Sequence, residues 1–176
     1  MGRAIGRRRR LRLNLWWKQS LGAVLILLTA ACSPHAATGG AAAPAASSAV
    51  HPVSGLAVIP LSISGSGTVH RFRVEVARSE AEQEKGLMFR TAMGADEGMI
   101  FPMNPPRSAA FWMRNTVIPL DIIFIGSDHR ILNIAANAVP YDERPLPSAG
   151  AASGVLELNG GRAAGLGIGP GDRVAW

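Results

Sequence analysis

Residues 111–125 read FWMRNTVIPLDIIFI, and this stretch says more about the fold than any other part of the chain. Polar side chains interrupt a run that is otherwise nearly all apolar. A buried polar group costs free energy unless it has a hydrogen-bonding partner, so such a mixture indicates a binding site or a structural network. The candidate residues in this stretch are Trp112, Arg114, Asn115, Thr116 and Asp121.

The stretch predicts two β-strands, at residues 110–116 and 120–125. Side chains alternate between the two faces of a strand, so the first strand would present Trp112, Arg114 and Thr116 on one face. Both faces of the second strand are largely apolar. That pattern is typical of a strand inside a sheet.

Asp121 lies near the start of the second strand and, once buried, needs a hydrogen-bond donor. Arg114 is the partner that we expect. Two interpretations stay open. In one, these two residues line a small cleft with Trp112 and Asn115, where the guanidinium binds a carboxylate or phosphate and the indole stacks on a sugar ring. In the other, Arg114 and Asp121 form a purely structural ion pair, and Asn115 and Thr116 fix the turn between the strands.

Short strand patterns occur on both sides of this stretch. Regular alternation over residues 70–77 predicts a strand with one wet face, on which Glu75 would lie. Ser79-Glu-Ala-Glu82 is a capping box and predicts one helix, from residue 79 to about residue 88. Further strands are expected at residues 56–63, 99–101, 131–139, 155–158 and 173–176. Many short strands and one helix predict a mainly β sandwich or barrel, with an α+β arrangement as the alternative.

The basic residues of the chain are concentrated at its start. Residues 1–32 carry seven basic and no acidic side chains, whereas residues 33–176 carry 11 basic and 12 acidic ones. The net charge of the second part is therefore −1. Such a balance does not fit a nucleic-acid-binding surface on the folded part.

The basic residues precede an apolar run of eleven residues, Leu21–Ala31, which is shorter than the ~20 residues that span a bilayer. This order is typical of an export signal. The sequence Thr29-Ala-Ala-Cys32 is similar to the lipobox of bacterial lipoproteins, in which the cysteine becomes the lipidated first residue of the mature chain. We therefore expect a lipoprotein-type signal peptide at residues 1–31 and a lipid on Cys32, the only cysteine of the chain.

These features predict the domain organisation and the location. Residues 32–54 are rich in Ala, Gly, Pro and Ser, a composition that predicts a flexible tether. Residues 55–176 have the length of one globular domain. We expect an exported protein anchored in the periplasm or at the outer membrane through the lipid on Cys32, or, as the alternative, a soluble secreted protein.

Several motifs of the domain resemble, in the same order, those of the domain of unknown function 192 family. They are Gly86-Leu-Met-Phe-Arg90, Gly98-Met-Ile-Phe101, Phe111-Trp-Met-Arg-Asn-Thr116, Pro119-Leu-Asp-Ile-Ile-Phe124, Val155-Leu-Glu-Leu158 and Gly169-Pro-Gly-Asp172. The resemblance implies a mainly β, jelly-roll-like domain in a protein that is often exported or membrane-anchored. It implies no established activity and no cofactor.

Glu157 is a further candidate because it interrupts the apolar run 155–158. With Asp121 it would form the carboxylate pair of a hydrolase or lyase, whereas an ion pair or a solvent-facing position is the simpler explanation. The domain holds two histidines without a metal-ligand spacing, so we expect no metal site and no cofactor. Five methionines between residues 88 and 113 offer soft ligands for copper, but this pattern is more typical of core packing.

The sequence favours a non-catalytic binding module of the bacterial cell envelope. Its ligand would be small and anionic or carbohydrate-like. The expected ligand-binding residues are Trp112, Arg114, Asn115, Thr116, Asp121 and Glu157. A hydrolase or lyase that uses Asp121 and Glu157 is one alternative, and a structural or partner-docking envelope protein with an unspecified protein partner is the other.

Overall fold

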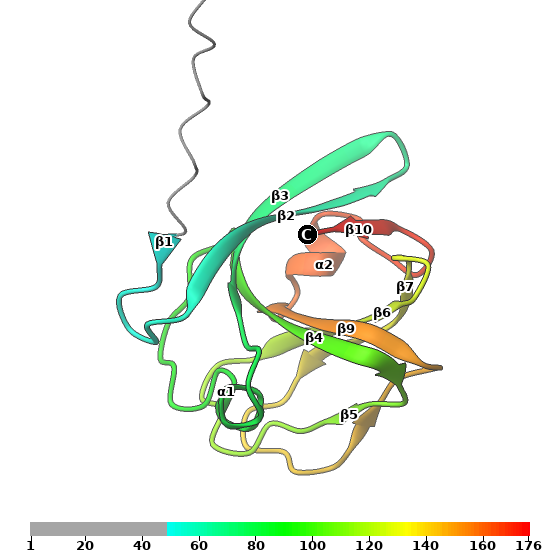
Figure 1. Ribbon diagram of the computed structural model, residues 1–176. Coiled ribbons are helices and arrows are strands. Elements are labelled where there is room, and N and C mark those ends of the chain that lie inside the picture. Colours follow the sequence, from blue (N-terminus) through cyan, green and yellow to red (C-terminus); the bar gives the residue numbers. More distant parts are fainter. Residues whose placement is uncertain (1–48) are drawn as a thin grey trace, which may run out of the picture. The chain divides into compact units, whose positions relative to one another are not determined.

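The computed structural model describes residues 49–176, which form ten strands and two short helices (Figure 1). The strands are β1 (Ala49–Val50), β2 (Ala57–Gly65), β3 (Thr68–Val76), β4 (Glu97–Arg107), β5 (Ala110–Phe111), β6 (Leu120–Gly126), β7 (Ile131–Ala138), β8 (Leu146–Pro147), β9 (Ala152–Asn159) and β10 (Arg173–Ala175). The helices are α1 (Glu80–Lys85) and α2 (Arg162–Gly165). In this part of the chain, no helix is long and apolar enough to cross a membrane.

Eight of the strands form one curved sheet in the order β1–β2–β3–β4–β9–β6–β7, with β10 paired to β2. Neighbours in this sheet are antiparallel except β3 and β4, which are parallel. β5 and β8 form a separate two-stranded ribbon. The fold is thus mainly β and sandwich-like, which confirms the predicted fold class.

The central strands β4, β9 and β6 separate two apolar cores. Along β6, Ile123 and Ile125 pack into the first core, whereas Ile122 and Phe124 pack into the second. Strands β2, β3 and β10 and helix α2 lie on the side of the first core, and α1 and β5 lie on the side of the second (Figure 1). Because all seven residues of β6 are buried, the prediction of an inner strand is confirmed.

The predicted capping box at the start of α1 is present. The Ser79 hydroxyl accepts a hydrogen bond from the backbone N–H of Glu82, and the Glu82 carboxylate accepts one from the backbone N–H of Ser79 at 2.8 Å. The helix ends at Lys85, three residues before the predicted end. Gly86 follows with a φ of +47°, which glycine adopts more readily than other residues.

The segment predicted as a strand over residues 110–116 is a strand only at Ala110–Phe111. A turn follows, in which the backbone N–H of Thr116 donates to the carbonyl of Met113 at 3.1 Å. Asn115 in this turn has a φ of +54°, a left-handed conformation that asparagine tolerates better than most residues. The prediction that the strand continues through residues 112–116 is wrong, because the chain is not extended there.

The first strand, β1, begins before residue 55, where the globular domain was predicted to begin. Residues 49–56, which we call the arm, start with β1 on the edge of β2. Two arm side chains contact Glu75: the Ser54 hydroxyl donates to its carboxylate, and His51 Nδ1 lies 3.7 Å from it. Arg90 completes the cluster with an Nη1–Oε1 distance of 2.9 Å. Glu75 is only 3 % exposed, so the prediction that it faces solvent is wrong.

Candidate functional site

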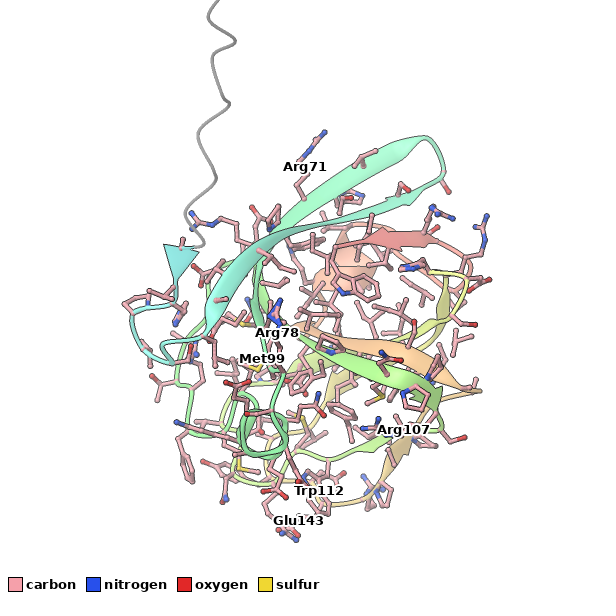
Figure 2. All side chains as sticks on the ribbon, in the orientation of Figure 1. Arg71, Arg78, Met99, Arg107, Trp112 and Glu143 are labelled. Atoms are coloured by element: carbon pink, nitrogen blue, oxygen red, sulfur yellow. The ribbon has the colours of Figure 1, made fainter. Side chains whose placement is uncertain are left out.

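A cleft of about 790 Å³ opens between α1 and the turn that follows β5. We call this space the cleft. The residues that line it are Glu80, Ala81, Gln83, Glu84, Lys85, Met88, Met103, Arg107, Phe111, Trp112 and Arg114. Figure 2 shows Trp112 and Glu143 at the end of the domain that lies farthest from Arg71.

Arg114 lies at the solvent-exposed rim of the cleft. Its guanidinium stacks over the indole of Trp112, 4.4 Å from the ring centroid. Its Nε and Nη2 groups donate to one carboxylate oxygen of Glu143, at 3.1 and 2.8 Å. These hydrogen bonds raise the pKa of Arg114. The side chains of Arg114 and Glu143 are 46 % and 55 % exposed, so both are accessible to a ligand.

Asp121 is not the partner of Arg114, and the predicted ion pair is wrong. The Asp121 side chain is fully buried and accepts three backbone N–H groups instead. The donors are Asn137 at 2.8 Å, Gly161 at 2.9 Å and Ala163 at 2.8 Å. This carboxylate therefore joins β6 to the end of β7 and to the start of α2, and its role is structural.

Asp121 and Glu157 lie on opposite faces of the sheet. In the antiparallel register of β6 and β9, Asp121 is opposite Leu158, and Glu157 is opposite Ile122. Directly opposed residues share a face and successive residues alternate, so the two carboxylates point into different cores. The arrangement that a hydrolase with paired carboxylates requires is absent between these two residues.

Glu157 lies at the floor of a hollow of about 70 Å³, which shares α1, Trp112 and Arg114 with the cleft. We call this space the hollow; Phe101, Phe111 and Thr116 also line it. Glu157 is 5 % exposed, and no hydrogen bond or ion pair within residues 49–176 reaches its carboxyl group. Burial raises the pKa of Glu157 to about 8, so the group is mostly protonated at neutral pH.

The hollow brings together Trp112, Arg114, Thr116 and Glu157 of the six predicted residues. Asn115 lies beside it and connects the turn to the chain after α1. Its side-chain amide lies 3.8 Å from the sulfur of Met88, and its carbonyl accepts the backbone N–H of Phe89 at 2.8 Å. Asp121 is the exception, since it faces the other core.

Sequence reasoning did not identify the α1 side of the cleft, where Gln83, Glu84 and Lys85 lie. The capping box predicted the helix, but nothing in the sequence indicated which of its faces would meet Trp112. Among the described residues, no group of three or more His, Cys, Asp or Glu side chains is arranged to hold a metal ion.

Comparisons with other proteins agree with this geometry at the level of the fold. The model of a family described as Uncharacterized ACR, the domain of unknown function 192 family, matches residues 61–176. A comparison with curated proteins finds no match.

Two solved structures are similar to this chain. One is a protein of unknown function from Novosphingobium aromaticivorans DSM 12444, with 66 % identity and a TM-score of 0.73 over 75 % of this chain and 94 % of that chain. The other is a putative transcription regulator from Sinorhizobium meliloti 1021, with 40 % identity and a TM-score of 0.66 over 68 % of this chain and 94 % of that chain.

Proposed function

Because the chain belongs to the domain of unknown function 192 family, whose description names no activity, we propose a function from the cleft itself. We propose that the protein is a non-catalytic binding module of the bacterial cell envelope. Its ligand is small, anionic or carbohydrate-like, and binds in the cleft.

The observation that carries this proposal is the pairing of Arg114 with Trp112 at the rim of the cleft. The guanidinium lies over the indole and presents donors in a planar fork, which matches a carboxylate or phosphate. Lys85 and Arg107 line the same cleft, so it holds three cationic side chains against the two carboxylates of Glu80 and Glu84. Trp112 is 48 % exposed, and an exposed indole offers a flat apolar surface for a sugar ring.

Arg114 is available to a ligand even though it contacts Glu143. Ion pairs between exposed side chains contribute little to stability, because solvent screens them and both side chains lose conformational freedom. A ligand carboxylate can replace the Glu143 carboxylate without leaving a buried charge unpaired. Glu143 then acts as an internal competitor for the anion.

The lining residues support binding rather than catalysis. None of the residues that line the cleft or the hollow is a serine, histidine or cysteine. Asp121 does not pair with Glu157, because it faces the other core, and the second carboxylate that lines the hollow is that of Glu84 on α1. A nucleic-acid-binding role, which the description of the Sinorhizobium meliloti protein suggests, is not favoured because residues 33–176 carry a net charge of −1.

A thermal-shift and calorimetric screen of small carboxylates and neutral sugars tests the proposal. We expect at least one carboxylate to stabilise the wild-type domain, and Arg114→Ala to weaken its binding by roughly tenfold or more, because charge-assisted hydrogen bonds are lost. Arg71→Ala is the matched control, since this exposed arginine lies at the far end of the domain (Figure 2). A screen in which no compound binds, or in which both variants bind equally, would contradict the proposal.

We also propose that the protein is exported and attached to the membrane through a lipid on Cys32. The support comes from the sequence, in which a basic segment, an apolar run and a lipobox-like motif follow one another. Cys32 lies outside the residues that the structure describes. Secretion as a soluble protein is the alternative.

A further inference from the structure

The floor of the hollow is a carboxyl group in apolar surroundings. On β9, Glu157 lies between Met99 of β4 and Ile122 of β6, both of which are fully buried. No hydrogen bond or ion pair within residues 49–176 reaches its carboxyl group, and its oxygens are not among the enclosed unpartnered atoms of the described residues, so they keep access to the hollow. A polar side chain that is 95 % buried and faces an open hollow points to a ligand as the missing partner.

We infer that the hollow is a subsite in which Glu157 binds a hydroxyl group of the ligand, and that the ligand is a hydroxylated carboxylic acid of the sugar-acid class whose carboxylate is held by Arg114. This inference rests on the proposed function, because it names the ligand class of the same cleft. Trp112 lines both the hollow and the cleft and offers the surface for the ring.

The chemistry of a protonated carboxyl group favours a hydroxyl partner. Its O–H donates and its C=O accepts, and a hydroxyl group can meet both requirements at once. Since burial keeps Glu157 mostly protonated at neutral pH, the floor carries no charge to attract a cation.

The sizes of the two spaces agree with a hydroxyl group in the hollow and the rest of the ligand in the cleft. The hollow, at about 70 Å³, is much the smaller of the two spaces and suits a small polar group such as a hydroxyl or hydroxymethyl group. The cleft, at about 790 Å³, has room for the ring and its carboxylate.

The charged groups that face Glu157 come from α1 and from the turn. They are Glu84 and Lys85 on the helix and Arg114 on the turn, whereas the neighbours from β4 and β6 are apolar. Ionisation of Glu157 above pH 8 removes its O–H donor and adds a negative charge. Both changes weaken binding of a sugar acid, so affinity should fall as the pH rises through this value.

Isothermal titration calorimetry with three probes tests the inference. D-Glucuronate carries a carboxylate and hydroxyls, D-glucose lacks the carboxylate, and glutarate lacks the hydroxyls. We expect wild-type protein at pH 6.5 to bind glucuronate roughly tenfold more tightly than either of the others, since only glucuronate can satisfy both Arg114 and Glu157.

The variants separate the role of Glu157 from that of the rest of the cleft. Glu157→Gln keeps a neutral donor and acceptor and should bind glucuronate within about threefold of the wild type, whereas Glu157→Leu should lose roughly tenfold. Between pH 6.5 and 9.5 the affinity of the wild type for glucuronate should fall by several-fold or more, because the protonated fraction of Glu157 falls over this range. The affinity of Glu157→Gln for glucuronate should change little over the same pH range. Any change that this variant does show measures the contribution of the other charged groups.

The possible results distinguish this inference from the proposed function. Binding of glucuronate or glutarate that depends on Arg114, but is the same in Glu157→Leu and at pH 9.5, would overturn the inference and leave the proposed function standing. Failure of every small carboxylate and sugar to bind would overturn the proposed function and the inference with it. The pH comparison between wild type and Glu157→Gln does not depend on whether Glu157→Leu folds.

Discussion

At the scale of single residues, Asp121 explains why a carboxylate interrupts the apolar stretch 111–125. Its buried side chain accepts three backbone N–H groups from segments that lie far along the chain. We expect Asp121→Asn to lower the free energy of unfolding by about 2–4 kcal/mol, because the amide has one acceptor oxygen and sets an NH₂ group against backbone donors. Urea denaturation followed by circular dichroism measures this change.

Asp128→Asn is the matched control for this prediction. Asp128 is exposed and accepts one backbone N–H, from Arg130 at 3.1 Å, so the substitution should cost less than about 1 kcal/mol. Equal effects of the two substitutions would contradict the structural role of Asp121.

The sequence predicted that Asp121 needs a hydrogen-bond donor, but the expected donor, Arg114, was wrong. The donors are backbone groups 16, 40 and 42 residues away, and no side-chain pattern marks a backbone N–H as a future partner. The prediction for residues 70–77 was wrong at Glu75 for a related reason. Alternation assigned Glu75 to the wet face, but Arg90 and the arm cover that position from elsewhere in the chain.

At the scale of elements, the Glu75 cluster fastens the arm to β3 and to the chain after α1. The side chains of Glu75 and Arg90 are only 4 % and 11 % exposed. Removing one of them therefore leaves a buried charge without a partner, which destabilises the folded state. We expect Arg90→Ala to destabilise the domain by ~3–5 kcal/mol and to speed hydrogen exchange in the arm. Urea denaturation and exchange mass spectrometry measure the two effects.

The double variant Glu75→Leu/Arg90→Met is the control for a buried ion pair. It removes both charges together and should recover most of the lost stability, since replacing the whole pair with apolar groups is often nearly neutral. A double variant as unstable as Arg90→Ala would show that the cost lies in packing rather than in the unpaired charge.

The elements differ in how well their local sequence predicts them. The capping box of α1 and the apolar run of β6 predicted both elements, because their signals are local. β4 was predicted only at residues 99–101, since its three prolines indicated a loop. The strand instead reaches Arg107 through pairing with Ala152, a contact between distant segments with an irregular register.

At the scale of the whole molecule, the neighbouring strands β6 and β9 place two carboxylates in different surroundings. The alternating residues of β6 and β9 send Asp121 into the first core and Glu157 towards the second, so one carboxylate becomes structural and the other reaches the hollow. Alternation along each strand was predictable. The curl of the sheet and the position of α1 were not, because they depend on contacts between elements.

The attachment of the whole chain to the cell is tested at Cys32. Residues 33–48 separate this cysteine from β1, and 16 residues span at most ~58 Å, so a lipid on Cys32 would keep the domain close to the membrane. We expect Cys32→Ser to move the protein from the membrane fraction to the soluble fraction, because the thiol that carries the lipid is lost. Cell fractionation with immunoblotting measures this shift, and Thr38→Ala should leave the protein in the membrane fraction. Retention of Cys32→Ser in the membrane fraction would refute lipid anchoring at this residue.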